Sequence, residues 1–296
     1  MMRQLILIHG RAQENKDAAG IKKEWIGAWE KGLAKHGLDN PITDADVHFP
    51  YYGDTLAQMA GGLSAENAAE VIIKGPPPAS AEQELMREMI EEIARKEGIS
   101  DAEIRAELSA EVINKGPLNW GWVQGIFSAL DKVRPISSKI LALVTADVAK
   151  YLTNAAIQQK INDGVVKAVA AGQEAVVVSH SLGTVVAYNV LMSRPTAFPQ
   201  VKVPLFVTLG SPLAVNAVRS RLTPHTFPKP VGKWYNAMDP DDVVSLYPLT
   251  ANRFNTGGTI ENHESVDNWT DNQHSIGGYL DDAKVAKKIY DALKAV

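Results

Sequence analysis

The chain has 296 residues, enough for one large α/β domain or two small ones, and 45% of them are hydrophobic and 22% charged. Its 30 lysines and arginines are scattered and are outnumbered by 34 acidic residues, so we expect no nucleic-acid partner. The absence of cysteine excludes disulfides, thiolate metal sites and a cysteine nucleophile.

The N-terminal segment MMRQLILIH contains an apolar run of only four residues. Such a run is too short for the core of a signal peptide or for a membrane span. We therefore expect a cytoplasmic protein without a transmembrane segment. The oligomeric state is not predictable from the sequence.

That apolar run, Leu5 to Ile8, predicts a buried parallel strand that leads into a loop at His9-Gly10. A loop after such a strand can present backbone N–H groups, here of Arg11 or Ala12, to a negatively charged oxygen on a substrate. The alternative is a glycine turn with His9 hydrogen-bonded in the core.

The next two elements continue an alternation of strands and helices. Residues 22–37 place Trp25, Ile26, Trp29 and Leu33 at helical spacing, which predicts an amphipathic helix that ends at Gly37. The segment DVHFP at 46–50 predicts the second strand.

Residues 54–150 interrupt this alternation, because no strong strand pattern occurs in them. We expect a charged helix over 81–97, a helix capped near Ser100, and apolar helical segments over 120–130 and 140–152. This block is therefore predicted to be a helical insertion on an α/β core that comprises residues 1–53 and 151–296. Its apolar faces either line a pocket or pack against the core or a second subunit.

The segment QEAVVVSHSLGTVVAYNVLM at 173–192 follows a helix predicted over 155–171. Three consecutive valines, 176–178, predict a buried strand, and helical spacing resumes at Leu182. Ser181 therefore lies at the tip of a sharp strand-to-helix turn, within the pattern S-H-S-L-G. A serine that only caps the helix is the alternative.

A turn of this shape exposes the serine hydroxyl, and the backbone N–H of Leu182 at the helix N-terminus can stabilise an oxyanion formed there. Gly183 would let the helix approach the sheet closely. A serine hydroxyl needs a histidine to accept its proton and a carboxylate to orient that histidine.

Candidates for both partners follow in the expected order along the chain. Strands are predicted over 203–209 and 233–238, and Asp239, Asp241 and Asp242 come directly after the second of them. His274 and His263 are the candidate bases, and His180 beside the serine is expected to be structural. The remaining histidines lack the spacing of metal ligands, so neither a metal nor another cofactor is expected.

Together these segments resemble the α/β-hydrolase superfamily, in its esterase and lipase branch. The matching segments are ILIHG at 6–10, VVVSHSLG at 176–183, TLGSP at 208–212, WYNAMDPDDVVSLYP at 234–248 and NQHSIGGYL at 272–280. Ser179 departs from the family pattern, G-x-S-x-G, at its first glycine. The resemblance does not extend to the helical block.

The resemblance implies an α/β-hydrolase fold, a mostly parallel sheet flanked by helices, with the insertion as a cap or lid. It assigns the acid to Asp242, which begins a D-x-V-x-x-x-P run, with Asp239 as its alternate and Asp241 third. It also favours His274, which is followed by a tyrosine and a terminal helix, over His263 as the base.

The expected function is hydrolysis of a carboxylic ester with a small or lipid-like acyl group, through a Ser-His-Asp triad and an acyl-enzyme, without a cofactor. An amidase, thioesterase or acyltransferase would use the same triad. A third alternative is a non-catalytic interaction protein on a hydrolase fold, in which Ser181 and His274 would lie far apart.

Overall fold

A parallel β-sheet is the centre of the fold in the computed structural model, which describes residues 3–10, 17–52, 65–74, 81–133, 138–168, 174–193 and 201–295. The sheet has six strands in the order β2-β1-β3-β4-β5-β6, and every pair is parallel. The strands are β1 (Gln4–Ile8), β2 (Val47–His48), β3 (Glu174–His180), β4 (Lys202–Leu209), β5 (Trp234–Ala237) and β6 (Ile260–His263).

The central strands are buried on both faces of the sheet, which explains their nearly continuous apolar sequence. Alternate residues enter two separate cores: Ile6 and Val177 belong to one, and Leu7 and Val178 belong to the other. The runs of apolar, mostly β-branched residues therefore predicted β1, β3 and β4 correctly.

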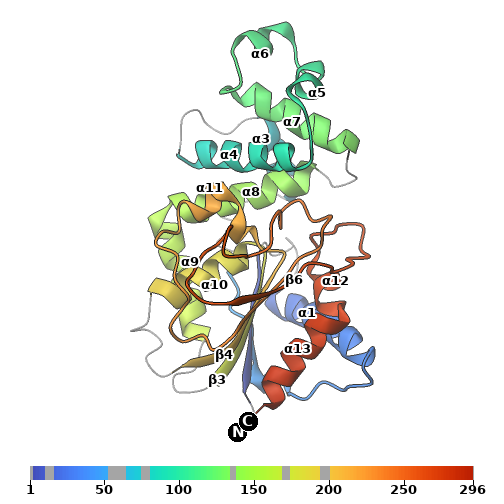
Figure 1. The fold of residues 1–296 in the computed structure, drawn as a ribbon, viewed down its shortest axis with the longest axis vertical. Coiled ribbons are helices and arrows are strands. Elements are labelled where there is room, and N and C mark those ends of the chain that lie inside the picture. The colour runs from blue at the N-terminus through green and yellow to red at the C-terminus, as the bar shows by residue number, and fades with distance from the viewer. Residues whose placement is uncertain are drawn as a thin grey trace.

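Helices cover both faces of the sheet (Figure 1). One face packs against α1 (Ala18–Ala34), α12 (Ile276–Asp281) and α13 (Ala283–Lys294), and Trp29 Nε1 of α1 donates to the Ala286 carbonyl of α13 at 3.1 Å. The opposite face packs against α9 (Ala155–Ala168) and α10 (Leu182–Ser193). The chain is thus an α/β protein with one all-parallel sheet flanked by helices.

In the described residues between β2 and α9, the block contains six helices. They are α3 (Ala65–Lys74), α4 (Ala81–Lys96), α5 (Asp101–Ala106), α6 (Ala110–Asn114), α7 (Trp120–Val133) and α8 (Ser138–Thr153). The predicted cap at Ser100 is present, because its hydroxyl accepts from Glu103 N. Trp122, Phe127 and most other apolar residues of α7 are buried in the same core as the sheet face beside α9 and α10.

The helical block lies at the end of the sheet opposite the chain termini (Figure 1). Since β1 starts near the N-terminus and all strands are parallel, this end is the carboxyl edge of the sheet. The block contacts the short helix α11 (Asn216–Arg219): Glu92 of α4 accepts from Asn216 N at 2.9 Å, and Glu88 pairs with Arg221 at 2.8 Å. The segment that follows β4 therefore lies against the block.

Two edge elements differ from the sequence prediction. The strand expected over residues 46–50 is only Val47–His48, because a 3-10 turn over Asp44–Asp46, stabilised by a capping box from Thr43, comes first. The strand β6 was not predicted at all. Its sequence, IENH, has one aliphatic residue and is only partly buried at the sheet edge, so it lacks the apolar pattern of a buried strand.

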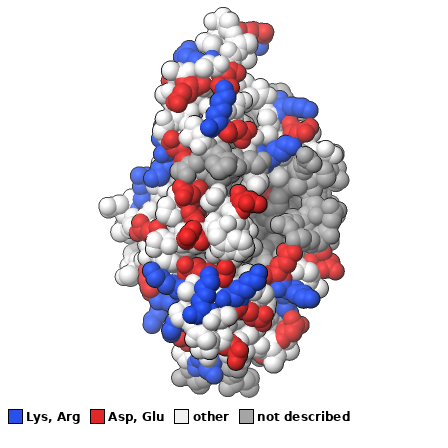
Figure 2. All heavy atoms as spheres, turned by 90° about the vertical axis from the view of Figure 1, so that its right-hand side faces the viewer, with Lys and Arg blue, Asp and Glu red and all other residues white. Residues whose placement is uncertain are grey.

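The described surface carries both signs of charge. On the face shown in Figure 2, lysine and arginine side chains are interspersed with aspartate and glutamate. Ion pairs such as Lys288 with Glu261 and Lys287 with Asp291 belong to this mixed pattern. Among the described helices, none is by itself long and apolar enough to cross a membrane; α8 and α9 reach that threshold only when joined, and they meet at a bend of 97°.

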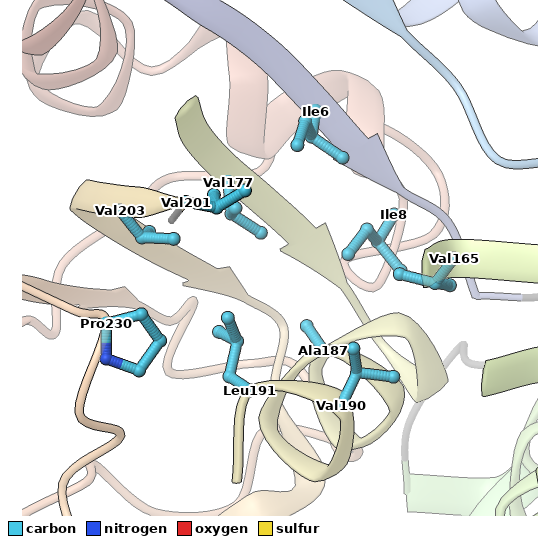
Figure 3. A pocket seen from close by; sticks show the side chains of 10 residues that line it. All are labelled: Ile6, Ile8, Val165, Val177, Ala187, Val190, Leu191, Val201, Val203 and Pro230. Atoms are coloured by element: carbon cyan, nitrogen blue, oxygen red, sulfur yellow. The ribbon is translucent and has the colours of Figure 1, made fainter. Parts of the chain in front are cut away.

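A cavity of about 20 Å³ lies between the sheet and α10 (Figure 3). Its ten lining residues are all apolar: Ile6, Ile8, Val165, Val177, Ala187, Val190, Leu191, Val201, Val203 and Pro230. The core on this side of the sheet is therefore incompletely packed near Val177.

Candidate functional site

Ser181 occupies a strained turn between β3 and α10. Its φ is +56°, and it is the one non-glycine residue with a positive φ in the described part of the chain. Such a conformation costs about 1–3 kcal/mol and persists only where surrounding contacts enforce it. Here Ser181 N donates to the Leu209 carbonyl at 3.1 Å, while the Ser181 carbonyl accepts from Thr184 N and from Thr184 Oγ1 at 2.9 and 2.7 Å.

Two glycines let the first loop and α10 come close to this turn. A Cβ on Gly183 would lie 2.2 Å from the Ile8 carbonyl oxygen, so no other residue fits there. A Cβ on Gly10 would lie 2.8 Å from Ser181 Cβ, which places the loop after β1 directly against the serine. Ser179 does not need the glycine of the family pattern, because its φ is not positive, and its hydroxyl donates to the Val207 carbonyl at 2.9 Å.

Ser181, His274 and Asp242 are joined by hydrogen bonds although they lie in three separate loops. His274 Nε2 is 2.7 Å from Ser181 Oγ, and His274 Nδ1 is 2.8 Å from Asp242 Oδ2. All three side chains are buried. In this arrangement the histidine can accept the serine proton on one nitrogen while the carboxylate stabilises the charge from the other.

Asp242 is held as a carboxylate by several donors. Tyr279 Oη donates to Asp242 Oδ2 at 2.7 Å, and Val244 N donates to Oδ1 at 2.9 Å. Burial alone would raise the pKa of Asp242, but the His274 charge and these hydrogen bonds outweigh burial and lower it. Asp242 therefore remains ionised where it can orient His274.

Asp239, the alternate acid, takes a different set of partners. Its two oxygens accept from Asp241 N and Asn268 N, each at 2.7 Å. Burial raises the pKa of Asp239 despite these two bonds. Asp239 thus anchors the loop that carries His274, and the structure places Asp242, not Asp239, at the histidine. Asp241 has an exposed side chain.

His263, the alternate base, lies at the end of β6. Its Nε2 is 3.3 Å from Asp282 Oδ1, at the start of α13, and its ring stacks with Tyr235. Its Nδ1 is 3.5 Å from Ser265 Oγ, so its polar contacts lie at the sheet edge and the start of α13, whereas His274 contacts Ser181 directly.

His9 is buried and stacks on Tyr52, with ring centroids 4.0 Å apart. Burial lowers the pKa of His9 to about 4, although a hydrogen bond to the Gly10 carbonyl acts in the opposite direction. His9 Nε2 accepts from Tyr52 N at 3.2 Å, so its proton lies on Nδ1, which donates to Gly10 O at 2.7 Å. His9 is therefore a buried, hydrogen-bonded core residue, which is the alternative that the sequence left open. Its bond to the Gly10 carbonyl also holds the start of the loop.

Leu182 and Arg11 are the two residues whose backbone N–H groups are expected to donate to an oxyanion. Leu182 is the first residue of α10, where backbone N–H groups have no partner within the helix. Arg11, like Ala12, lies outside the described residues.

Sequence reasoning assigned no role to Tyr279, Asn268 or Thr184, although all three stabilise this site. Tyr279 lies in the segment that carries the family resemblance, which was a usable signal. Thr184 follows Ser181 by three residues, the spacing at which a threonine hydroxyl reaches a backbone carbonyl one helical turn earlier. Asn268 has no signal in the sequence.

No group of three or more potential metal ligands occurs among the residues that the structure describes. A comparison of the sequence with protein-family models finds no match, and neither does a comparison with curated proteins.

Proposed function

We propose that this protein is a serine hydrolase of the α/β-hydrolase type that cleaves carboxylic esters. The observation that carries the proposal is the hydrogen-bonded chain Ser181–His274–Asp242, with Ser181 held at positive φ between a strand and a helix. A strained serine with a buried histidine and a buried, ionised carboxylate is the arrangement that nucleophilic acyl transfer requires.

Position in the fold also supports a site here. The strand order reverses at β1, since β2 lies on one side of it and β3 on the other. In open parallel sheets, ligands bind beyond the carboxyl ends of the strands at such a reversal. Gly10 follows β1 and Ser181 follows β3, so the candidate nucleophile lies at this point of the sheet.

In the proposed reaction, Ser181 Oγ attacks the ester carbonyl carbon while its proton moves to His274 Nε2. The resulting oxyanion is stabilised by the Leu182 N–H. The C–O bond to the leaving alcohol then breaks, and His274 returns its proton to that alcohol. Water, deprotonated by His274, hydrolyses the acyl-enzyme and restores the serine.

A fluorophosphonate probe tests the nucleophile. We expect covalent labelling of the wild-type protein at Ser181, and complete loss of labelling and of p-nitrophenyl ester hydrolysis in Ser181→Ala. Ser220→Ala, which removes a hydroxyl bonded to the Ala217 carbonyl in α11, is the control and should be labelled normally. Labelling that persists in Ser181→Ala would refute the assignment.

The same assay addresses the alternatives. A panel of esters with increasing acyl length, together with matched thioesters and anilides, distinguishes an esterase from a thioesterase or an amidase. The 2.7 Å separation of Ser181 Oγ and His274 Nε2 argues against a non-catalytic interaction protein, in which the two groups would be apart.

A further inference from the structure

Side-chain donors bind three consecutive carbonyl groups of the loop that carries His274. Asn268 Nδ2 lies 2.8 Å from the Gln273 carbonyl oxygen and 2.7 Å from that of Ser275. Between them, the carbonyl of His274 itself is 2.9 Å from His180 Nε2. The backbone at His274 is thus held by one residue of its own loop and by one residue from the end of β3.

His180 is buried among aromatic rings. Its ring centroid lies 4.8 Å from that of His274, 5.9 Å from that of Tyr279 and 6.2 Å from that of Trp25. Burial, followed by the charge of His274, lowers the pKa of His180 to about 3. A neutral imidazole has a single N–H, and because a carbonyl can only accept, that N–H lies on Nε2.

The His180 Nε2–H group also lies beside the bond between Asp242 and His274. A Cβ on Gly210 would be 3.1 Å from Asp242 Oδ2 and 3.2 Å from both His180 Nε2 and His274 Nδ1. These three polar atoms therefore surround one point in the site. His180 thus contacts the candidate catalytic histidine beside the bond that His274 makes to Asp242.

We propose that His180 is a positioning residue: its hydrogen bond to the His274 carbonyl fixes the distance from which the His274 imidazole reaches Ser181. His180 precedes Ser181 in the chain, so this bond connects the residue next to the nucleophile to the backbone of the base. The expected effect of His180 on kcat rests on the proposed hydrolase function. The hydrogen bond between His180 and the His274 carbonyl is independent of that function.

The competing explanation is that His180 only fills space in the core. A matched pair of substitutions separates the two. Glutamine places its Nε2 donor as many bonds from Cβ as histidine does, while methionine has a similar length and no donor. If packing alone matters, His180→Gln and His180→Met should behave alike.

We expect kcat of His180→Met to fall about 10²-fold with KM unchanged, because a displacement of the base by about 1 Å has an effect of that order. His180→Gln should recover most of this loss. Asn268 still holds the neighbouring carbonyls, so both variants should fold, as checked by circular dichroism and thermal unfolding. Equal kcat in the two variants would overturn the proposal.

A second readout does not depend on activity. The proton shared by His274 Nδ1 and Asp242 gives a low-field ¹H resonance, which should be present in the wild type and in His180→Gln and should broaden or disappear in His180→Met. If the wild type is not labelled at Ser181, the hydrolase function fails, and this resonance still decides the role of His180. If His180→Met does not fold, His180→Asn, whose donor is too short to reach the carbonyl, replaces it in the comparison with His180→Gln.

Discussion

Asp239 and Asp242 are three positions apart after β5 and are both buried, yet their environments differ. Asp242 is bonded to His274 and Tyr279, and these partners lower its pKa. Asp239 accepts only from backbone N–H groups, and burial raises its pKa. The two carboxylates are therefore distinguished by their partners and not by their position in the sequence.

This difference predicts separate effects of two matched substitutions. Asp242→Asn should lower kcat by about 10³–10⁴-fold, because an amide cannot stabilise the imidazolium and permits the wrong tautomer of His274. Asp239→Asn should mainly lower the free energy of unfolding, by about 1–3 kcal/mol, because one backbone N–H loses its acceptor. Steady-state kinetics and urea unfolding of both variants check this, and a larger kcat loss in Asp239→Asn would contradict it.

At the residue scale, the sequence singled out Ser181, His274 and Asp242 as candidates. It did not predict the side chains that hydrogen-bond to them. The family resemblance favoured Asp242 and His274, which the structure brings to Ser181. It offered no way to foresee that Tyr279 Oη reaches Asp242, since that contact depends on how α12 packs, 37 residues farther along the chain. His180 was expected to be structural, and its bond to the His274 carbonyl exists only once β3 and the last loop are adjacent.

At the scale of elements, the buried strands and the helices could be predicted from the sequence, and the strand at the edge of the sheet could not. Apolar runs located β1, β3 and β4, and helical spacing located α1, α4, α7 and α8. The edge strand β6 was missed because its residues are mostly polar, and its pairing with β5 is decided by backbone hydrogen bonds that side-chain pattern does not encode. The apolar helical segment predicted over 140–152 corresponds to α8, Ser138–Thr153.

The cavity beside α10 gives a prediction about packing (Figure 3). Val177→Ile adds one methylene on the cavity side of β3 and should raise the free energy of unfolding by about 0.5–1 kcal/mol. Val178→Ile, on the opposite and fully buried face, is the control and should lower the free energy of unfolding by about 1–3 kcal/mol through overpacking. Urea midpoints at constant m-value measure both, and equal effects of the two substitutions would contradict the assignment of the cavity.

At the scale of the whole molecule, His9 and His180 make stability depend on pH. Burial lowers the pKa of His9 from 6.5 to about 4 and that of His180 from 6.5 to about 3. Between these values and 6.5 the unfolded chain binds more protons than the folded protein, so acidification favours unfolding. Each histidine contributes about 1.4 kcal/mol per pH unit in that window.

We therefore expect the free energy of unfolding to fall by about 2.4 kcal/mol as the pH is lowered from about 6 to 5, a range that lies above most carboxyl titration. Urea unfolding at several pH values measures this slope. His9→Gln removes one of the two groups and should roughly halve it, whatever its effect on stability at pH 7. A wild-type slope near zero would show that these histidines are not buried in the neutral form.

The placement of the site along one edge of the sheet has a consequence for the order of folding. Ser181 and His274 are 93 residues apart, and they meet only when β3, β4, β5 and β6 are aligned and the loop after β6 has closed over them. Helices such as α4 and α7 form from local contacts, whereas pairing of distant parallel strands is slow. The hydrogen bond between Ser181 and His274 is thus among the last contacts that the chain can make, and recovery of the proposed ester hydrolysis after dilution from denaturant would follow the completion of the sheet and not the appearance of helix.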